Sequence, residues 1–205
     1  MDFQLLSKYK ISHPKYALCS SAEEAAKAAS KLGFPVALKI SSSEVLHKSD
    51  KGGVVLNLSN QQQVKDAYLN LIERFSGVKI EGVLVQKMVK TKDAVELIIG
   101  GKKDKQFGQL IMFGMGGIFV EVFHDVSFRV CPIYRSDAEE MIHELKSYPL
   151  LAGARGRKPI NQNAVVSMML KVSELLIKED PLEFDLNPVI ADSKSCTAVD
   201  VRLLK

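Results

Sequence analysis

The sequence is poor in cysteine and has no long apolar run, and each absence excludes a class of protein. Its three cysteines, Cys19, Cys131 and Cys196, lie far apart and include no CxxC pair. An odd number at these spacings argues against a zinc site and a disulfide framework, so we interpret them as reduced thiols. No apolar stretch approaches the roughly 18 residues of a membrane-spanning helix, and the N-terminus lacks the apolar segment of a signal peptide. We expect a cytoplasmic protein without membrane contacts.

Concentrated charge and low-complexity segments are also missing. The 205 residues carry a formal net charge of +4, and the lysines are spread along the chain instead of forming a basic run. This pattern does not favour a nucleic-acid partner. Hydrophobic residues make up 46% and charged residues 25%, which is the composition of an ordinary folded protein with its own core.

Helical patterns are marked by recognisable ends. Ser21 and Glu24 have capping-box spacing ahead of an alanine-rich run, which Gly33 ends. Apolar residues in 60–75 repeat at helical spacing. Two further helices are predicted at 137–147, capped by Ser136, and at 164–178.

Strand patterns gather in stretches separate from these helices. Short apolar runs predict strands at 36–40, 54–58, 83–89, 95–99, 109–113, 120–130, 182–190 and 197–201. Segregated helices and strands predict an α+β fold. Glycine and polar residues at the strand ends suggest a cleft between two subdomains, which we expect at 1–84 and 85–205.

Lys39 ends a predicted strand among apolar neighbours, so its ammonium either reaches the sheet edge as a surface lysine or points toward an anion. The loop SSSEVLHKSDKGGV follows. Its Gly52 and Gly53 have no Cβ, so their backbone amides can approach phosphate oxygens closely. The loop fits neither the Walker A pattern nor GxGxxG, and a simple turn is the alternative.

His47 is the most informative histidine because it lies among polar loop residues and not in an apolar stripe. A neutral, oriented imidazole can accept a phosphoryl group, and the carboxylate of Asp50 or Glu44 is close enough in sequence to fix its tautomer. A loop histidine without function is the alternative. No role is predicted for His13, His124 and His143.

A second glycine-rich run, FGMGG, lies between two predicted strands and contains Gly114, Gly116 and Gly117. Glycine at these positions indicates positive φ angles or close backbone contact. The carboxylates of Glu121 and Asp125 follow. Carboxylates at these positions have three alternative partners: a metal ion, a ribose, or a buried arginine such as Arg129.

The segment EFDLNP carries the clearest candidate metal ligands. The period of two along a strand places Glu183, Asp185 and Asn187 on one face, and Asp200 returns on the partner strand. Carboxylates on one sheet face repel each other unless a cation neutralises them, and Mg²⁺ bound to phosphate oxygens is suited to that role. A solvated polar face is the alternative.

Six segments in order, spread over nearly the whole chain, resemble a known family: PVALK, HKSDKGG, VLVQKMV, ELIIGGKKDKQFG, FGMGGIFVEVFHD and FDLNP. The chain resembles the ATP-grasp β subunit of ADP-forming acetyl-CoA (acyl-CoA) synthetases, relatives of succinyl-CoA synthetase. The resemblance implies an acid–thiol ligase with the ATP-grasp fold, in which two α+β subdomains hold ATP or ADP between them. Acetate is the default acyl group.

The resemblance also implies how the nucleotide is bound. Lys39 would contact its phosphates, and Glu96 would lie near its ribose. The backbone of Gln86, Met88 and Val89 would form a hinge that holds the adenine. Lys87 stands in that hinge where the family commonly has an acidic residue, which leaves the hinge role to the backbone.

The chemistry implied by the resemblance is a phosphate relay. Asn187 and Asp200 would hold Mg²⁺, supported by Asp185 and Glu121, while His47 would pass phosphate to ADP. The phosphate would come from an α subunit that carries the CoA-binding and phosphohistidine domains, in an α2β2 assembly. Two alternatives are an ATP-grasp ligase that works through an acyl phosphate without phosphohistidine, and a noncatalytic nucleotide-binding subunit.

Overall fold

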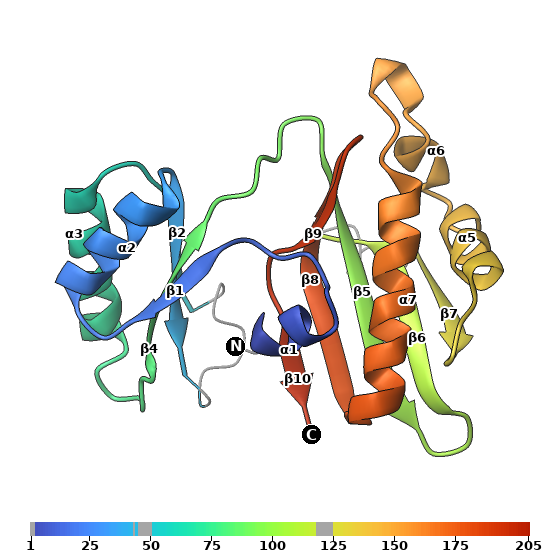
Figure 1. Cartoon of the computed structure of the whole chain (residues 1–205), viewed down its shortest axis with the longest axis horizontal. Coiled ribbons are helices and arrows are strands. Elements are labelled where there is room, and N and C mark those ends of the chain that lie inside the picture. The colour runs from blue at the N-terminus through green and yellow to red at the C-terminus, as the bar shows by residue number, and fades with distance from the viewer. Residues whose placement is uncertain (1–2, 43, 45–50, 118–124) are drawn as a thin grey trace. The chain divides into compact units, whose positions relative to one another are not determined.

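The computed structural model describes residues 3–42, 44, 51–117 and 125–205 (Figure 1). The predictions for His47, Asp50 and Glu121 lie outside these ranges. The chain divides into two compact units. The small unit comprises Pro14–Met88, and the large unit comprises Met1–His13 together with Val89–Lys205.

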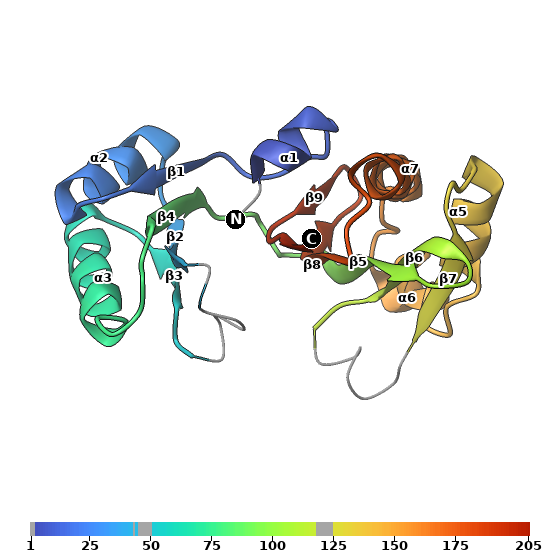
Figure 2. The same ribbon diagram turned by 90° about the horizontal axis from the view of Figure 1, so that it is seen from below.

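The small unit is a four-stranded antiparallel sheet with two helices on one face (Figure 2). The strand order is β1-β4-β2-β3, with bounds β1 (Tyr16–Cys19), β2 (Val36–Ser41), β3 (Val54–Leu58) and β4 (Gly82–Lys87). The covering helices are α2 (Ala22–Leu32) and α3 (Gln61–Arg74). Buried alanines of α2 pack with apolar residues of α3 and with alternate residues of β2 and β4 to form its core.

The helix ends of the small unit confirm the capping pattern. Ser21 Oγ accepts a hydrogen bond from the Glu24 amide at 3.2 Å, and the Glu24 carboxylate accepts one from the Ser20 amide at 2.9 Å. Gly33 follows α2 with a φ of 81°, which an L-residue rarely adopts. These local bonds satisfy helix-end groups that have no partner within the helix.

The large unit contains a six-stranded sheet whose main path runs β10-β8-β5-β6-β7, with β9 paired to β8. Its strands are β5 (Val95–Asp104), β6 (Gly108–Met115), β7 (Val126–Val130), β8 (Glu183–Ala191), β9 (Cys196–Ala198) and β10 (Arg202–Leu204). Its helices are α1 (Phe3–Lys8), α5 (Arg135–His143), α6 (Tyr148–Leu151), the short 3₁₀ turn η1 (Ala154–Gly156) and α7 (Gln162–Glu179). Both units mix helices with antiparallel strands, which confirms the α+β prediction.

Helix α7 covers one face of the large sheet (Figure 2), and the opposite face, called the open face below, carries a pocket. The eight buried residues of α7 include Leu175 and Leu176, both fully buried. A Cβ built on Gly101 of β5 would lie 2.3 Å from Leu176 Cδ2, so glycine lets the helix approach the strand. Gly101 therefore faces α7, and its neighbours Gly100 and Lys102 face the open side.

The N-terminal segment belongs to the large unit, although the chain continues from it into the small unit. Glu179 at the end of α7 accepts hydrogen bonds from Lys8 Nζ at 2.6 Å and Tyr9 Oη at 2.8 Å. The Ala198 amide donates to the Ser12 carbonyl at 2.9 Å. The observed division thus differs from the expected one at 84 in two ways: residues 1–13 join the C-terminal part, and the later boundary falls after Met88.

Helix α5 begins and ends earlier than predicted. The Tyr134 amide donates to the Asp137 carboxylate at 2.6 Å, and the helix begins at Arg135, so the prediction of a Ser136 cap was wrong. Beyond the helix, the amides of residues 146 and 147 donate to the Asp125 carboxylate. The prediction placed these two amides in the last helical turn, but in the structure they bond to Asp125 and not to carbonyl groups of the helix.

Two expectations from composition concern cysteines and membrane spans. The cysteines Cys19, Cys131 and Cys196 are all free and buried. Within the described ranges, no helix is both long and apolar enough to cross a bilayer.

The glycine-rich run at the end of β6 confirms the prediction of close backbone contact. A Cβ on Gly114 would lie 2.7 Å from the Asp125 carbonyl oxygen, and one on Gly116 would lie 3.0 Å from the Leu97 carbonyl oxygen. Gly117 has a φ of 66°. Glycine is required at the first two positions because the obstructing atoms are backbone, which cannot turn aside.

We predict that Gly114→Ala destabilises the protein by about 1–3 kcal/mol because β7 must move away from β6. Urea denaturation measures the change in unfolding free energy. Gly77→Ala is the control, since its Cβ would meet nothing within 4 Å, and we expect a change within about 0.5 kcal/mol. Equal effects of the two substitutions would contradict the packing argument.

Candidate functional site

Lys39 and Gln86 lie on the face of the small sheet opposite α2 and α3. Val36, Leu38 and Ile40 of β2 face the core, so Lys39 between them faces the other way. In the register of β2 with β4, Ala37 pairs with Gln86 and Lys39 with Leu84, which makes the two polar side chains diagonal neighbours. Their exposed fractions are 4% and 1%, so the alternative of a solvated surface lysine is wrong.

Both ends of the loop that contains His47 are anchored to the small unit. At the first end, Ser42 Oγ donates to the Lys79 carbonyl at 2.7 Å, and the Glu44 carboxylate accepts from the Lys79 amide at 3.3 Å. At the second end, the Gly53 carbonyl accepts from the Ile40 amide at 2.9 Å. The anchored ends of this loop are therefore next to Lys39.

Gly52 has a packing reason to be glycine. Its φ is 70°, and a Cβ there would lie 1.9 Å from a guanidinium nitrogen of Arg74. That nitrogen donates to the Gly52 carbonyl at 3.3 Å. The described contacts thus explain why residue 52 is glycine: it allows a positive φ and leaves room for the Arg74 side chain. Its contact with phosphate stays a prediction.

The predicted hinge coincides with the boundary between the two units, which falls between Met88 and Val89. The Met88 amide donates to the Pro35 carbonyl at 3.2 Å, and the Lys87 amide donates to the Lys15 carbonyl at 2.9 Å. Both amides are thus used within the small unit. A nucleotide base would have to be held by the other backbone groups of the hinge.

Glu96 and the glycine-rich run, predicted separately, lie side by side in the large unit. The Gly116 amide donates to the Glu96 carbonyl at 2.7 Å. A Cβ on Gly117 would lie 3.1 Å from Glu96 Oε2. The Glu96 side chain is exposed and pairs across strands with Ile190 of β8.

The two predicted metal ligands face each other across the C-terminal hairpin. Val189 pairs with Ala198, and Asp185 pairs with Arg202. Because both pairs have the same register, Asn187 lies opposite Asp200. The Val199 amide donates to the Pro188 carbonyl at 2.9 Å and carries that register through the break between β9 and β10.

The donor set of this pair fits Mg²⁺ better than a softer metal. Amide and carboxylate oxygens are the hard ligands that Mg²⁺ accepts, and it commonly takes only one or two from protein while substrate phosphates and water supply the rest. Among the described residues no group of three or more His, Cys, Asp and Glu side chains is arranged to hold a metal ion. The arrangement therefore suits an ion that arrives with a nucleotide.

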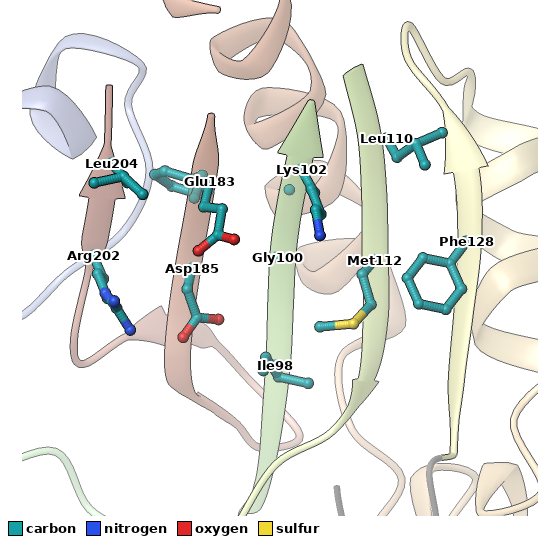
Figure 3. A pocket seen from close by; sticks show the side chains of 12 residues that line it. Ile98, Gly100, Lys102, Leu110, Met112, Phe128, Glu183, Asp185, Arg202 and Leu204 are labelled. Carbon is teal, nitrogen blue, oxygen red and sulfur yellow. The ribbon is translucent and has the colours of Figure 1, made fainter. Parts of the chain in front are cut away.

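A pocket of about 380 Å³ occupies the open face of the large sheet (Figure 3). Gly100 forms part of its floor, where a Cβ would lie 3.1 Å from Met112 Cε. Charged side chains from paired strands border one side, and apolar side chains border the other. The lining residues are Ile98, Gly100, Gly101, Lys102, Leu110, Met112, Phe128, Glu183, Phe184, Asp185, Arg202 and Leu204.

Sequence reasoning singled out Glu183 and Asp185 of this pocket as candidate metal ligands but missed their basic neighbours. Lys102 pairs across strands with Glu183, and Arg202 pairs with Asp185. The alternation Ile98, Gly100, Lys102 was a usable signal, because the period of two places these residues on one face. Recognising Arg202 required the register of β10, which no local pattern supplies.

Burial dominates the electrostatics of the Asp185 carboxyl group. Burial raises its pKa to about 6, the positive charge of Arg202 opposes that rise, and the negative charge of Asp200 adds to it. A carboxyl group with this pKa exchanges its proton close to neutral pH, so it can donate or accept a hydrogen bond beside the candidate metal pair.

Asp125 has a structural role in place of those considered from sequence. Its carboxylate oxygens accept hydrogen bonds from the amides of Lys146 and Ser147, each at 2.8 Å. Burial alone would raise the pKa of Asp125, but these hydrogen bonds outweigh it and lower the pKa below its ordinary value. Arg129 bonds instead to Glu144 and Glu140 of the α5 region, so the suggested pairing with Asp125 was wrong.

The fold and the candidate site define an ATP-grasp protein. The chain matches the ATP-grasp domain family over residues 2–204 and belongs to it. Its sequence is 41% identical to the β subunit of ADP-forming acetate–CoA ligase I from Pyrococcus furiosus, covering 98% of this chain and 88% of that subunit. Within the family it therefore belongs with the ADP-forming acyl-CoA ligases, which confirms the resemblance seen in the sequence and makes the chain part of a ligase.

Other relatives and solved structures agree with this assignment. The chain is 42% identical to the ADP-forming acetate–CoA ligase II of Archaeoglobus fulgidus but spans only 29% of that protein. An acetyl-CoA synthetase structure from Ca. Korarchaeum cryptofilum, with coenzyme A, Ca-AMPCP and HgCl⁺, has a TM-score of 0.94 and 44% identity, covering 98% of this chain and 90% of that one.

A second structure of that synthetase contains coenzyme A and Mg-AMPPCP and has its phosphohistidine segment pointing towards the nucleotide-binding site. It has a TM-score of 0.85 and 44% identity, covering 97% of this chain and 87% of that one.

Two aspartates should respond to pH with opposite signs. The raised pKa of Asp185 means that its ionised form is penalised in the folded state, so stability falls as pH rises from about 4 through 6. Asp185→Asn should therefore raise the unfolding free energy at pH 8 by up to about 3 kcal/mol and leave it nearly unchanged at pH 3.

Asp125→Asn is the matched comparison. The lowered pKa of Asp125 means that its carboxylate stabilises the fold above its unfolded pKa of about 4 and that this contribution is lost as pH falls. We expect a loss of about 1–3 kcal/mol at pH 8 that shrinks in acid. Chemical denaturation at both pH values measures both variants, and the same sign for the two at pH 8 would contradict these assignments.

Proposed function

We propose that the chain binds ADP and transfers a phosphoryl group to it from His47, in the reversible reaction of an ADP-forming acyl-CoA synthetase. The observation that carries the proposal is the gathering of candidate nucleotide and metal ligands at one end of the large sheet. Glu96 lies beside Gly117 there, and Asn187 lies opposite Asp200. The nucleotide analogues in the Korarchaeum structures support this choice of ligand.

Each residue has a distinct part in this proposal. The Lys39 ammonium contacts the nucleotide phosphates, and the hinge backbone around Met88 and Val89 holds the base. Asn187 and Asp200 hold Mg²⁺, which supplies positive charge to the transferring phosphoryl group. As the N–P bond of phosphorylated His47 breaks, a β-phosphate oxygen of ADP forms the new P–O bond, and the electron pair stays on the imidazole nitrogen.

A partner chain completes the reaction. We propose an α subunit with the CoA-binding and phosphohistidine domains, joined with this chain in an α2β2 assembly. The Pyrococcus furiosus relative is named as a β subunit, which supports a partner. The acyl group would be selected mainly on that partner, with acetate as the default.

The relay predicts a transient label on His47. The chain is mixed with its α partner, acetyl-CoA and labelled phosphate without ADP, and mass spectrometry under alkaline conditions locates the label. We expect label on His47 that added Mg-ADP discharges to ATP, because phosphohistidine is stable to base. His47→Ala should abolish turnover and leave ADP binding nearly intact, whereas the control His143→Ala should keep full activity. Label on the partner alone, or full activity in His47→Ala, would refute the relay.

Two further substitutions separate phosphate binding from metal binding. Lys39→Ala should weaken ADP binding itself, because it removes the cation that faces the phosphates. Asp200→Asn should raise the Mg²⁺ concentration for half-maximal activity by about tenfold or more, because a charged hard ligand is lost. Isothermal titration with ADP and activity over a Mg²⁺ series measure the two effects. Unchanged metal dependence in Asp200→Asn would exclude it as a ligand.

A further inference from the structure

Lys87, at the end of β4, reaches away from the face that carries Gln86. Its parity along the strand is that of Val83 and Val85, which pack in the core beneath the helices. Lys87 Nζ donates to the carbonyl oxygens of Gly33 and Phe34, each at 2.7 Å. The ammonium therefore lies on the helix-covered side of the sheet, at the C-terminal end of α2, while Gln86 lies on the opposite side.

These bonds belong to a set that joins the hinge to the turn between α2 and β2. Lys87 pairs with Val36 in the register of β4 with β2, and the Met88 amide donates to the Pro35 carbonyl. On the other side, the Lys87 amide donates to the Lys15 carbonyl. The backbone of residues 86–88 is thus held from both sides, and one side chain supplies two of the contacts.

The charge of Lys87 matters as well as its hydrogen atoms. Gly33 is the C-cap residue of α2, where helix carbonyl groups have no partner within the helix and carry partial negative charge, which a cation stabilises. Hydrogen bonds with a charged donor are roughly twice as strong as neutral ones. No described carboxylate forms an ion pair with Lys87, so within this part of the chain the ammonium serves the turn after α2.

We propose that Lys87 is a positioning residue for the nucleotide base, an inference that rests on the proposed role of the hinge in binding ADP. By holding Gly33 and Phe34 against β4, it fixes the backbone of Met88 in the conformation that presents the hinge to the base. Without this bond the hinge backbone has more conformations in the free protein, and ordering them lowers the affinity for ADP.

A graded series of full-length variants tests the inference, with Mg-ADP as the probe in isothermal titration. Lys87→Met removes both hydrogen bonds and the charge and should raise the Kd for ADP about tenfold. Lys87→Gln keeps one donor group without the charge, and its Kd for ADP should lie between those of Lys87→Met and the original protein. Lys87→Arg keeps the charge and both donors and should stay within about twofold of the original protein.

Kinetics and a matched control separate positioning from general destabilisation. In the complex with the α partner, Lys87→Met should raise the KM for ADP and leave kcat within about twofold, because chemistry does not involve the base. Lys65→Met is the control, since it removes an ammonium that pairs with Glu23 at 3.4 Å elsewhere in the small unit. It should leave both constants unchanged.

Each outcome decides a different point. An unchanged Kd in Lys87→Met, an equal loss in Lys65→Met, or a fall in kcat alone would overturn the role of Lys87 while the original protein still binds ADP. Failure of the original protein to bind Mg-ADP would overturn the proposed function and this inference with it. If Lys87→Met does not fold, comparison of Lys87→Gln with Lys87→Arg decides, and equal affinities in those two would refute the proposal.

Discussion

The candidate site of the large unit depends on the register of β8 with the returning chain. Strand β8 pairs with β9 and with β10 in the same register: Val189 is opposite Ala198, and Asp185 is opposite Arg202. A slip of one residue would turn the polar side chains of β8 toward α7 and expose the residues that now pack there. The apolar core beneath α7 therefore specifies which oxygens point to the open face.

Several charged side chains bond to backbone groups in the structure, among them Asp125, which the sequence offered as a ligand. Arg74 bonds to the carbonyl of Gly52, Lys87 to the turn after α2, and Asp125 to the amides after α5. Each contact fixes a segment next to a candidate binding element. Each unit thus has two layers of its own: candidate residues on the open face of its sheet, and charged residues elsewhere that limit backbone movement.

The fold was predictable from sequence wherever the signal was local. The cap at Ser21, the stop at Gly33 and the short apolar run around Lys39 all depend on residues within one turn or one strand, and the structure has α2 and β2 where they were expected. The same holds for the hairpin that brings Asn187 opposite Asp200, because two strands joined by a short turn pair with each other.

Features that depend on contacts distant in sequence could not be predicted in this way. Ser136 has the chemistry of a cap, yet α5 begins two residues earlier than that cap predicts, after Tyr134, whose amide donates to Asp137. Lys87 appeared only as a departure from a family pattern, since its partners lie over 50 residues away. The position of Arg202 opposite Asp185 follows from the register of β10 with β8, which the sequence does not show. The roles of His47 and Glu121 stay predictions from resemblance.

The packing of residues 3–13 on the large unit has a consequence for synthesis on the ribosome. The segment is made before the small unit, yet its partners Lys171, Glu179 and Ala198 are made after it. The small unit, by contrast, has a core built entirely from residues 14–88 and a sheet whose first and last strands pair directly. The small unit can therefore fold on the ribosome before α7 and β9 have emerged, whereas the N-terminal segment can form its contacts with the large unit only afterwards.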